Sequence, residues 1–449
     1  MANSEWRSAT LGAIAQREYG LVDGPFGSNL PASDYTRSGV PVIRGSNLSL
    51  GGTRFSDKEF VFVSEDTARR LSRSTCKAED IIFTKKGTLG QTGIVPRHHE
   101  FDRFLLSSNQ MKLSVDRMKA DPLFIYYVVS SPASRTKLIQ DSSVTGVPKT
   151  NLTYLREFSI LLPPLAEQTK IANALGALDD KIELNRKMNE ALEAMARALF
   201  KSWFVDFDPV RAKAEGRDPG LPAHIAALFP GSFEDSELGE VPTDWKIISL
   251  GDFAEVIDCL HSRKPERVEE GLPLLQLGNI RADALLDMTD TYLITSEDYT
   301  KWISRMEASP GNCVVTNVGR VGAVAQIPSD FKAALGRNMT GIRCRTAYPF
   351  PTYLIQALTS SSMSEEIIRK TDSGTILDSL NVRNIPRLRI IVPPIQILAL
   401  FEHQCRPIRA RMEANLKETS SLATLRDTLL PKLISGGMHV PAATLESTI

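Results

Sequence analysis

The fold of this chain is decided by residues 163–206, which read PPLAEQTKIANALGALDDKIELNRKMNEALEAMARALFKSWFVD. The two opening prolines end whatever element precedes them, because proline fixes φ and has no N–H to donate. The residues that follow, up to Phe204, contain no further proline and only one glycine, and they are rich in Ala, Leu, Glu, Lys and Met, which favour helix. The stretch therefore predicts a helix of roughly 40 residues, about 60 Å long.

Apolar residues recur along this helix at steps of four and three. The seam contains Ile171, Leu175, Leu178, Ile182, Leu192, Ala196, Leu199 and Trp203, with Asn185 and Asn189 at its two middle steps. Such spacing is a heptad repeat, in which polar seam residues lower stability but fix register and partner. We therefore expect the helix to lie against a second helix.

A second copy of the stretch begins about 230 residues further on, where Pro393 and Pro394 repeat the two prolines. Its seam contains Phe401, Cys405, Ile408, Met412, Asn415, Thr419, Leu422, Leu429 and Leu433. Asn415 falls on Asn185, so the polar step is repeated. Arg426 interrupts the seam, and we expect Leu425 to cover that position. We predict that the two helices pair; the alternative is that each helix caps its own neighbouring domain.

The regions that precede the two helices also repeat. GVPVIRGSNL (39–48) matches GLPLLQLGNI (271–280), and TKKGTLGQTGIVP (84–96) matches TNVGRVGAVAQIP (316–328). In the first region we predict a strand, a glycine-containing turn and a strand over 79–96, a strand pair over 105–115 and a helix over 121–140. Glycine, proline and apolar positions repeat, whereas polar loop residues differ. The pattern indicates two modules that share a scaffold and recognise different ligands.

These repeats predict a mixed α/β (α+β) chain of two tandem modules, each followed by one long helix of a coiled-coil pair. The division is module 1 over 1–162, the first helix over 163–205, a connector over 206–240, module 2 over 241–392, the second helix over 393–435 and a flexible tail over 436–449.

Composition excludes several classes of protein. The apolar fraction of 42% is ordinary, no apolar run of about 18 residues occurs, and the first residues lack the core of a signal peptide, so we expect a cytoplasmic protein without a membrane segment. Five scattered cysteines, with no CxxC pair, argue against a disulfide framework or a zinc site. The 53 basic residues are balanced by 53 acidic ones, whereas a freestanding nucleic-acid binder is usually basic.

Motifs of the common enzyme classes are missing. The sequence contains no GxxxxGK[ST], HExxH or GxSxG, and no GxGxxG that opens a helix after a strand. LPPL (162–165) and VPPI (392–395) lack the polar and aromatic flanks of the adenine methyltransferase motif. We therefore predict no catalytic residues, no metal site and a binding role, and we keep open an enzyme with unrecognised motifs.

The central stretch resembles the first conserved region of the specificity subunits of type I DNA restriction–modification enzymes, and LRDTLLPKLISG (425–436) resembles the end of their second conserved region. One departure is that Glu167 and Gln168 have no counterpart after Pro394, where the sequence is IQIL. With the repeat, the resemblance covers essentially the whole chain.

The resemblance implies a non-catalytic subunit whose two target-recognition domains each read one half of a bipartite DNA site. The same resemblance implies that two long antiparallel coiled-coil helices separate these domains in a pseudo-two-fold repeat. It also implies two methylation subunits and motor–nuclease subunits as partners. No cofactor is expected on this chain, because the partners bind S-adenosylmethionine, ATP and Mg²⁺. The remaining alternative is a coiled-coil adaptor that binds protein without reading bases.

Candidate DNA-binding residues are the Arg, Lys, Asn, Gln, Ser and Thr side chains of the repeated loops, since these groups match the donors and acceptors of base edges. In module 1 they are Arg44, Ser46, Asn47, Lys85, Lys86, Thr88, Asn109 and Lys149; in module 2 they are Gln276, Asn279, Arg281, Asn317, Arg320, Arg337 and Asn338. The alternative for each is a solvated loop residue or a turn cap, above all for Asn47 and Asn279, because Asn after Gly often caps a turn.

Overall fold

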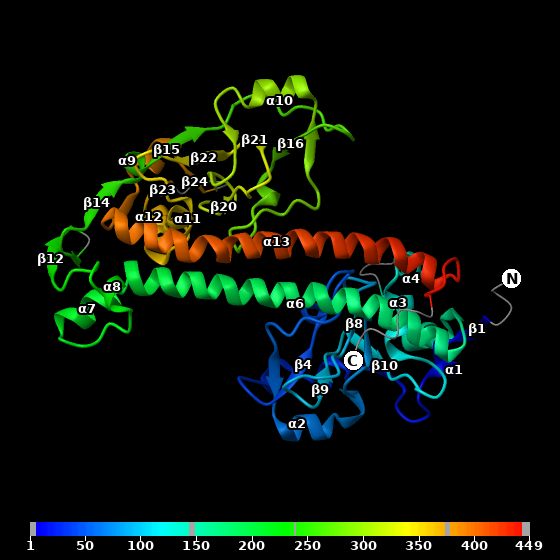
Figure 1. The fold of residues 1–449 in the computed structure, drawn as a ribbon. Coiled ribbons are helices and arrows are strands. Elements are labelled where there is room, and N and C mark those ends of the chain that lie inside the picture. The colour runs from blue at the N-terminus through cyan, green and yellow to red at the C-terminus, as the bar shows by residue number, and fades with distance from the viewer. Residues whose placement is uncertain (1–5, 143–148, 238, 373–377, 442–449) are drawn as a thin grey trace. The chain divides into compact units, whose positions relative to one another are not determined.

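The computed structural model describes residues 6–142, 149–237, 239–372 and 378–441. The chain forms two compact units (Figure 1). Unit 1 comprises Met1–Leu184 and Glu418–Ile449, and unit 2 comprises Asn185–Lys417. Both units combine helices and strands, so the predicted mixed α/β class is confirmed. Each unit is considered by itself below.

Unit 1 contains two larger sheets and one strand pair. The four-stranded sheet has the order β2 (Leu21–Asp23), β10 (Gln110–Leu113), β7 (Ile81–Thr84) and β8 (Thr92–Ile94). The five-stranded sheet has the order β3 (Tyr35–Thr36), β5 (Val61–Val63), β4 (Val40–Ile43), β9 (Phe104–Leu106) and β6 (Thr75–Cys76). A separate pair joins β1 (Arg7–Thr10) to β11 (Ser159–Leu162). Strands β4 and β9 run parallel, and all other pairs are antiparallel.

The helices of unit 1 are short apart from the two long ones. They are α1 (Leu11–Ile14), α2 (Glu65–Arg70), α3 (Pro122–Ser130), α4 (Pro132–Gln140) and α5 (Leu152–Glu157). The helix predicted over 121–140 is two helices, because Ser131 is extended and its hydroxyl caps α4 at Ser134. The strands predicted over 105–115 exist, but their pairing with each other is wrong: β9 joins one sheet and β10 the other.

Unit 2 repeats this topology, except that its second sheet has no described counterpart of β3. Its first sheet has the order β15 (Ala254–Asp258), β22 (Met339–Cys344), β19 (Cys313–Thr316) and β20 (Val324–Gln326). Its second has the order β17 (Tyr292–Ile294), β16 (Leu272–Leu275), β21 (Ala333–Leu335) and β18 (Glu307–Ala308), and β14 (Lys246–Ser249) pairs with β25 (Arg389–Val392). Strands β16 and β21 are parallel, as β4 and β9 are in unit 1. The internal repeat predicted from the sequence is therefore confirmed.

The remaining elements of unit 2 include most of the predicted connector. The helices are α7 (Asp208–Ala214), α8 (Ala223–Ala226), α9 (Leu250–Phe253), α10 (Ser296–Trp302), α11 (Pro351–Leu358) and α12 (Ser361–Arg369). The strands are β12 (Phe233–Ser236), β13 (Gly239–Pro242), β23 (Thr371–Asp372) and β24 (Ser379–Leu380). Phe207, Val210, Ile225 and Phe229 lie in the main core of unit 2, so this part of the connector is packed.

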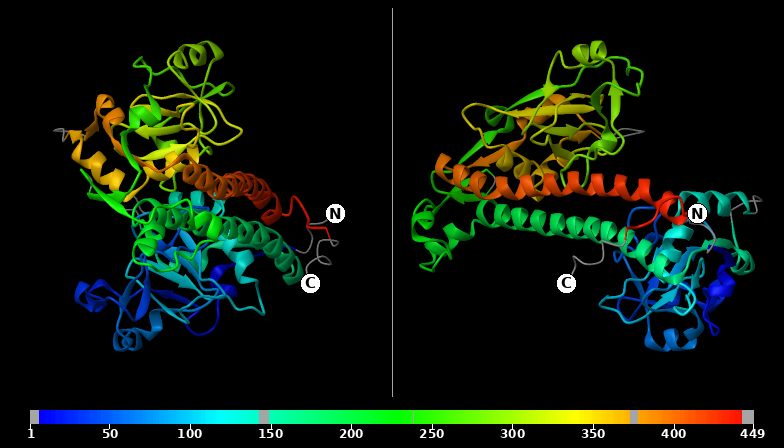
Figure 2. Two further views of the ribbon diagram at one scale, coloured as in Figure 1. Left: turned by 60° about the vertical axis from the view of Figure 1, so that its left-hand side comes forward. Right: turned by 45° about the vertical axis from the view of Figure 1, so that its right-hand side comes forward.

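Two helices of 40 residues each, α6 (Leu165–Phe204) and α13 (Ile395–Ile434), carry the heptad seams. In unit 1 the start of α6 shares a core with the end of α13, through Ile171 and Leu433. In unit 2 the end of α6 packs on the start of α13, where the rings of Phe204 and Phe401 lie 5.1 Å apart. Both units therefore hold the helices side by side and antiparallel, as predicted (Figures 1 and 2).

The seam residues face the partner helix or the core. All twelve register residues are buried or half-buried: Ile171, Leu175, Leu178, Ile182, Asn185, Leu192, Leu199, Ile408, Met412, Asn415, Leu422 and Leu429. The polar step links the helices within unit 2, since Asn415 Nδ2 donates to Asn189 Oδ1 over 2.8 Å and Asn189 Nδ2 donates to the Met412 carbonyl. The expectation that Leu425 covers the seam is wrong: Leu425 is 47% exposed, and Arg426 is buried instead.

Two further observations concern the ends and the surface of the chain. Of the tail predicted over 436–449, residues 442–449 lie outside the described residues, whereas His439 Nδ1 lies 3.3 Å from Glu167 Oε1 in unit 1. Among the described residues, no helix combines the length and the apolar character that crossing a membrane requires.

Candidate nucleic-acid interface

A polar cleft of about 520 Å³ opens in unit 1, and it gathers five of the predicted DNA-binding residues. These are Arg44, Ser46, Lys86, Thr88 and Asn109; the other lining residues are Tyr35, Gly45, Thr84, Gln91, Ser107, Ser108 and Gln110. They come from the turn after β4, the turn between β7 and β8, and the turn between β9 and β10. The residues that line the cleft include two cations and no carboxylate, so its charge favours an anionic ligand.

Backbone contacts hold these turns together. Gly87 and Gly90 have φ values of +106° and +86°, which permit the tight turn between β7 and β8. The Lys85 N–H donates to the Asn109 carbonyl over 2.7 Å, and Lys86 forms an isolated bridge with Lys149. The predicted residues of the two turns are therefore fixed next to one another by main-chain bonds.

Two predicted lysines lie beside the cleft and do not line it. The Nζ of Lys85 is 3.2 Å from Asp23 Oδ1, so its charge is engaged in an ion pair. Lys149 is exposed next to Lys86. Of these two, Lys149 is the one whose charge faces solvent.

Asn47 and Asn279 have the same structural role in the two units. The Asn47 side chain is fully buried; its Oδ1 accepts the Arg44 N–H, and its Nδ2 donates to the carbonyls of Ser56 and Lys58. The Asn279 Oδ1 accepts the Gln276 N–H over 2.7 Å, and its Nδ2 donates to the Asp287 carbonyl over 2.7 Å. Both amides thus hold a turn from inside and offer no group to a base edge in this conformation.

Seven lining residues were missed by the sequence reasoning, and they include Tyr35 and the two glutamines Gln91 and Gln110. Gln91 Oε1 accepts the Thr84 hydroxyl over 3.3 Å, and Gln110 bonds to the Ser107 hydroxyl. Gln91 lies between the glycine turn and β8, and Gln110 is the first residue of β10, so the signal of both is a polar residue at the start of a buried strand beside a repeated turn. A Gln amide is suited to paired hydrogen bonds with adenine.

In unit 2 the corresponding turns also meet. The Asn317 N–H donates to the Asn338 carbonyl over 2.8 Å, which repeats the contact between Lys85 and Asn109. Arg320 Nη1 donates to the Ile280 carbonyl over 2.8 Å and so connects the β19–β20 turn to the turn after β16. Arg337 is exposed beside Asn338.

Several predicted side chains of unit 2 are already bonded within the unit. Arg281 forms a bidentate pair with Asp283, at 3.0 and 2.9 Å, and this hydrogen bond is the main cause that raises the pKa of Arg281. Asn317 is buried, and its Oδ1 accepts the Thr340 hydroxyl. Gln276 Nε2 donates to the Leu275 carbonyl over 3.0 Å. The exposed candidates of this unit are therefore Arg320 and Arg337.

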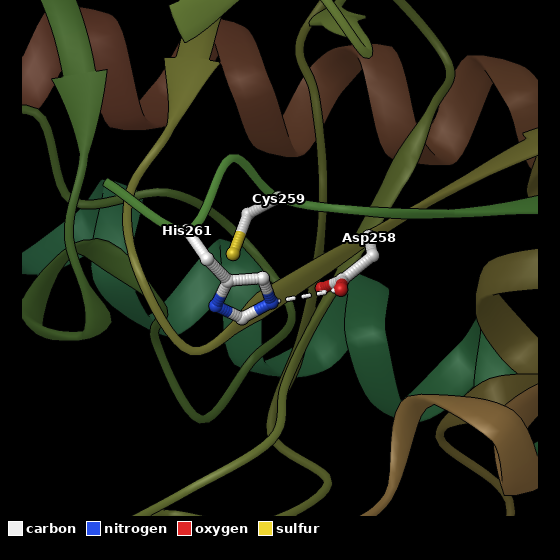
Figure 3. Close-up of side chains that lie close together, drawn as sticks. All are labelled: Asp258, Cys259 and His261. Atoms are coloured by element: carbon white, nitrogen blue, oxygen red, sulfur yellow. Dashed lines mark hydrogen bonds and ion pairs between the residues drawn. The ribbon is translucent and has the colours of Figure 1, made fainter.

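Asp258, Cys259 and His261 lie together at the end of β15 (Figure 3), with one ligand-type atom each within 4.8 Å of the others. His261 Nε2 is 2.8 Å from Asp258 Oδ2, and Arg305 Nη1 is 3.5 Å from the same oxygen. Burial raises the pKa of the Cys259 thiol, which favours the protonated form over the thiolate that binds metals. The equivalent Asp23 in unit 1 pairs with Lys85. His261 and Arg305 thus both contact Asp258 Oδ2, whereas Asp258 Oδ1 is buried with no hydrogen-bond partner among the described residues.

The type I restriction modification DNA specificity domain matches residues 27–194. The chain is similar to the type I restriction enzyme HindI specificity subunit of Haemophilus influenzae, with 25% identity over 75% of this chain and 82% of that protein. It is also similar to the MjaIX specificity subunit of Methanocaldococcus jannaschii, with 23% identity over 97% of both chains. The crystal structure of the type I restriction–modification S subunit from M. genitalium has a similar fold, with a TM-score of 0.55 and 18% identity over 95% of this chain and 96% of that one.

Repeated mixed modules on paired helices, with polar loops and a restriction-system specificity domain, define a target-recognition subunit. The matched domain and the named relatives support the resemblance to the specificity subunits of type I restriction–modification enzymes that the sequence indicated. Members of this family are non-catalytic.

Proposed function

We propose that the chain reads a bipartite site on double-stranded DNA, with one half-site contacted by each unit. The observation that carries the proposal is the cleft of unit 1, where Arg44, Lys86 and Asn109 converge without a carboxylate. Arg and Lys pair with guanine edges or phosphates, and Asn and Gln pair with adenine. The repeated turns of unit 2, with Arg320 and Arg337 exposed, support a second and different half-site.

The partners and cofactors follow from the same proposal. Two methylation subunits bind S-adenosylmethionine and modify adenine, and motor–nuclease subunits use ATP and Mg²⁺ for cleavage, all in the cytoplasm. The equal numbers of basic and acidic residues, 53 each, support this division, since phosphate binding rests on net positive charge that the partners supply in part. The pseudo-two-fold repeat within the chain suits a pair of identical methylation subunits.

The test is single-molecule sequencing of adenine methylation in cells that contain the partners, with and without this chain. We expect methylation at one split motif to disappear when the chain is absent. An unchanged methylation pattern with active partners would refute the proposal and leave a protein-binding adaptor as the function to pursue.

A further inference from the structure

In unit 1 a buried arginine of α13 donates a hydrogen bond to the loop of residues 44–56, which begins with three residues that line the cleft. Arg426 Nη1 donates to Asp179 Oδ1 over 2.8 Å and to the Gly52 carbonyl over 3.2 Å. Burial by itself would lower the pKa of Arg426, but the hydrogen bond and charge of Asp179 outweigh it and raise that pKa. The second oxygen of Asp179 accepts the Tyr127 hydroxyl over 2.6 Å. The loop, α3, α6 and α13 therefore meet at one carboxylate.

In unit 2 another arginine of α13 makes the same kind of contact. Arg409 Nη2 donates to the Ala284 carbonyl. The Arg409 side chain is 7% exposed and lies 3.9 Å from Glu413 Oε1. Burial lowers the pKa of this guanidinium, yet arginine stays protonated in proteins. A buried cation with a carbonyl acceptor is costly to place, because its desolvation is repaid only by good hydrogen bonds and charge partners.

The two acceptor carbonyls occupy equivalent places in the repeat. Gly52 and Ala284 each follow the buried turn asparagine by five residues, counting from Asn47 and Asn279. Both have positive φ, +112° and +57°, which is unusual for Ala284 because it has a side chain. The same bend of the same loop is thus fixed in both units.

The two arginines, however, do not occupy equivalent places. By the displacement of about 230 residues between the two helices, Arg426 falls on Ala196 and Arg409 falls on Asp179. The hydrogen bond from a buried arginine to the bend of the loop is therefore made from non-equivalent positions of α13 in the two units. A duplicated ancestor does not by itself produce this arrangement, so it points to a requirement that both units share.

We propose that Arg426 and Arg409 are positioning residues. Each fixes one loop, residues 44–56 in unit 1 and residues 276–287 in unit 2, on α13 and thereby sets base discrimination at the half-site of its own unit. The inference rests on the proposed function. Arg44 and Ser46 stand at the start of the first loop, and Gln276 at the start of the second. A loop released at its bend presents these side chains in many orientations and distinguishes bases poorly.

The test uses the full chain assembled with its methylation subunits and the split motif found by sequencing. The first variant is Arg426→Met with Asp179→Asn, so that no lone buried charge remains; the second is Arg409→Met. Arg411→Met, at an exposed position of the same helix, is the matched control. Methylation rates are compared on the intact motif and on duplexes with one base pair changed in either half-site.

For each variant we expect the ratio of methylation rates between intact and altered duplexes to fall by at least about fivefold at one half-site. The affected half-site should differ between the two variants, and the other half-site and the control should be unchanged. Full discrimination at both half-sites, or an equal loss at both, would overturn the proposal. If a Met variant fails to assemble, Arg426→Lys and Arg409→Lys are used, with the same expectation. A wild-type complex without sequence preference would refute the proposed function itself, which is a distinguishable result.

Discussion

Asp179→Ala is expected to destabilise unit 1 strongly. The Asp179 side chain is 5% exposed and accepts hydrogen bonds from Arg426 and Tyr127. Removing it leaves the buried Arg426 guanidinium with only the exposed carboxylate of Asp427 as an ionic partner, and it leaves the Tyr127 hydroxyl without its acceptor. The two losses differ in size, because only one of them leaves a charge.

The magnitude follows from these contacts. Breaking a buried ion pair by removing one partner costs about 3–5 kcal/mol, and an ordinary lost hydrogen bond adds about 1 kcal/mol. A domain of roughly 200 residues loses about 2–4 °C of melting temperature per kcal/mol, so the melting transition of unit 1 should fall by roughly 10–20 °C.

The adjacent residue supplies the control. Asp180 also pairs with an arginine, Arg54, but its side chain is 70% exposed. An exposed ion pair contributes at most about 1 kcal/mol, so Asp180→Ala should shift the transition by only a few degrees. Both variants are measured by differential scanning calorimetry of the full chain, with hydrogen exchange of α3 to assign the transition to unit 1. Equal shifts for the two variants would show that the burial argument is mistaken.

Three further outcomes are expected. In unit 2, Asn189→Ala and Asn415→Ala should each cost about 1–2 kcal/mol, with a coupling energy of about 1 kcal/mol in a urea double-mutant cycle; additive effects would contradict the hydrogen bond between them. Burial raises the pKa of Glu402, which caps α11, so the folded state binds this proton more tightly than the unfolded state and stability falls as the pH rises between the unfolded-state and folded-state pKa values. Glu402→Gln should flatten that part of a pH series of urea midpoints, and an unchanged slope would disprove the linkage. Lys86→Ala should weaken binding of the assembled complex to all duplexes and reduce the salt slope by about 0.9, whereas Lys137→Ala on α4 should change neither; titrations at several salt concentrations decide this.

The long helices and the repeat were predictable because their signals are local or duplicated. A heptad seam follows from the residues of one helix, and a repeated Asn step identifies its partner. The pairing of β9 and β10 was not predictable in the same way, since neighbouring strands separated by a short turn usually pair with each other. Here each strand joins a different sheet, and the partners that decide this lie far away in the sequence.

Arg426 shows why the packing of the helices could be predicted only in part. A charged residue in an apolar seam looks like a fault when one helix is considered alone. Its partner Asp179 lies 247 residues away, on the other helix. At the cleft, the type of residue and its place in a turn identified Arg44, Lys86 and Asn109. No local pattern shows whether a side chain is already bonded within the protein, as those of Asn317 and Arg281 are, because this depends on tertiary contacts.

The turns built on Asn47 and Asn279 bear on how such a protein changes its target. The side-chain amide of Asn47 or Asn279 holds each turn from inside, so the outward-facing residues beside it contribute little to folding. Those positions already differ between the two copies, with Arg44 against Gln276 and Ser46 against Gly278. Mutations there alter the chemical face shown to a duplex while the framework beneath stays intact. New sequence preferences can therefore arise by single substitutions, without an intermediate that fails to fold.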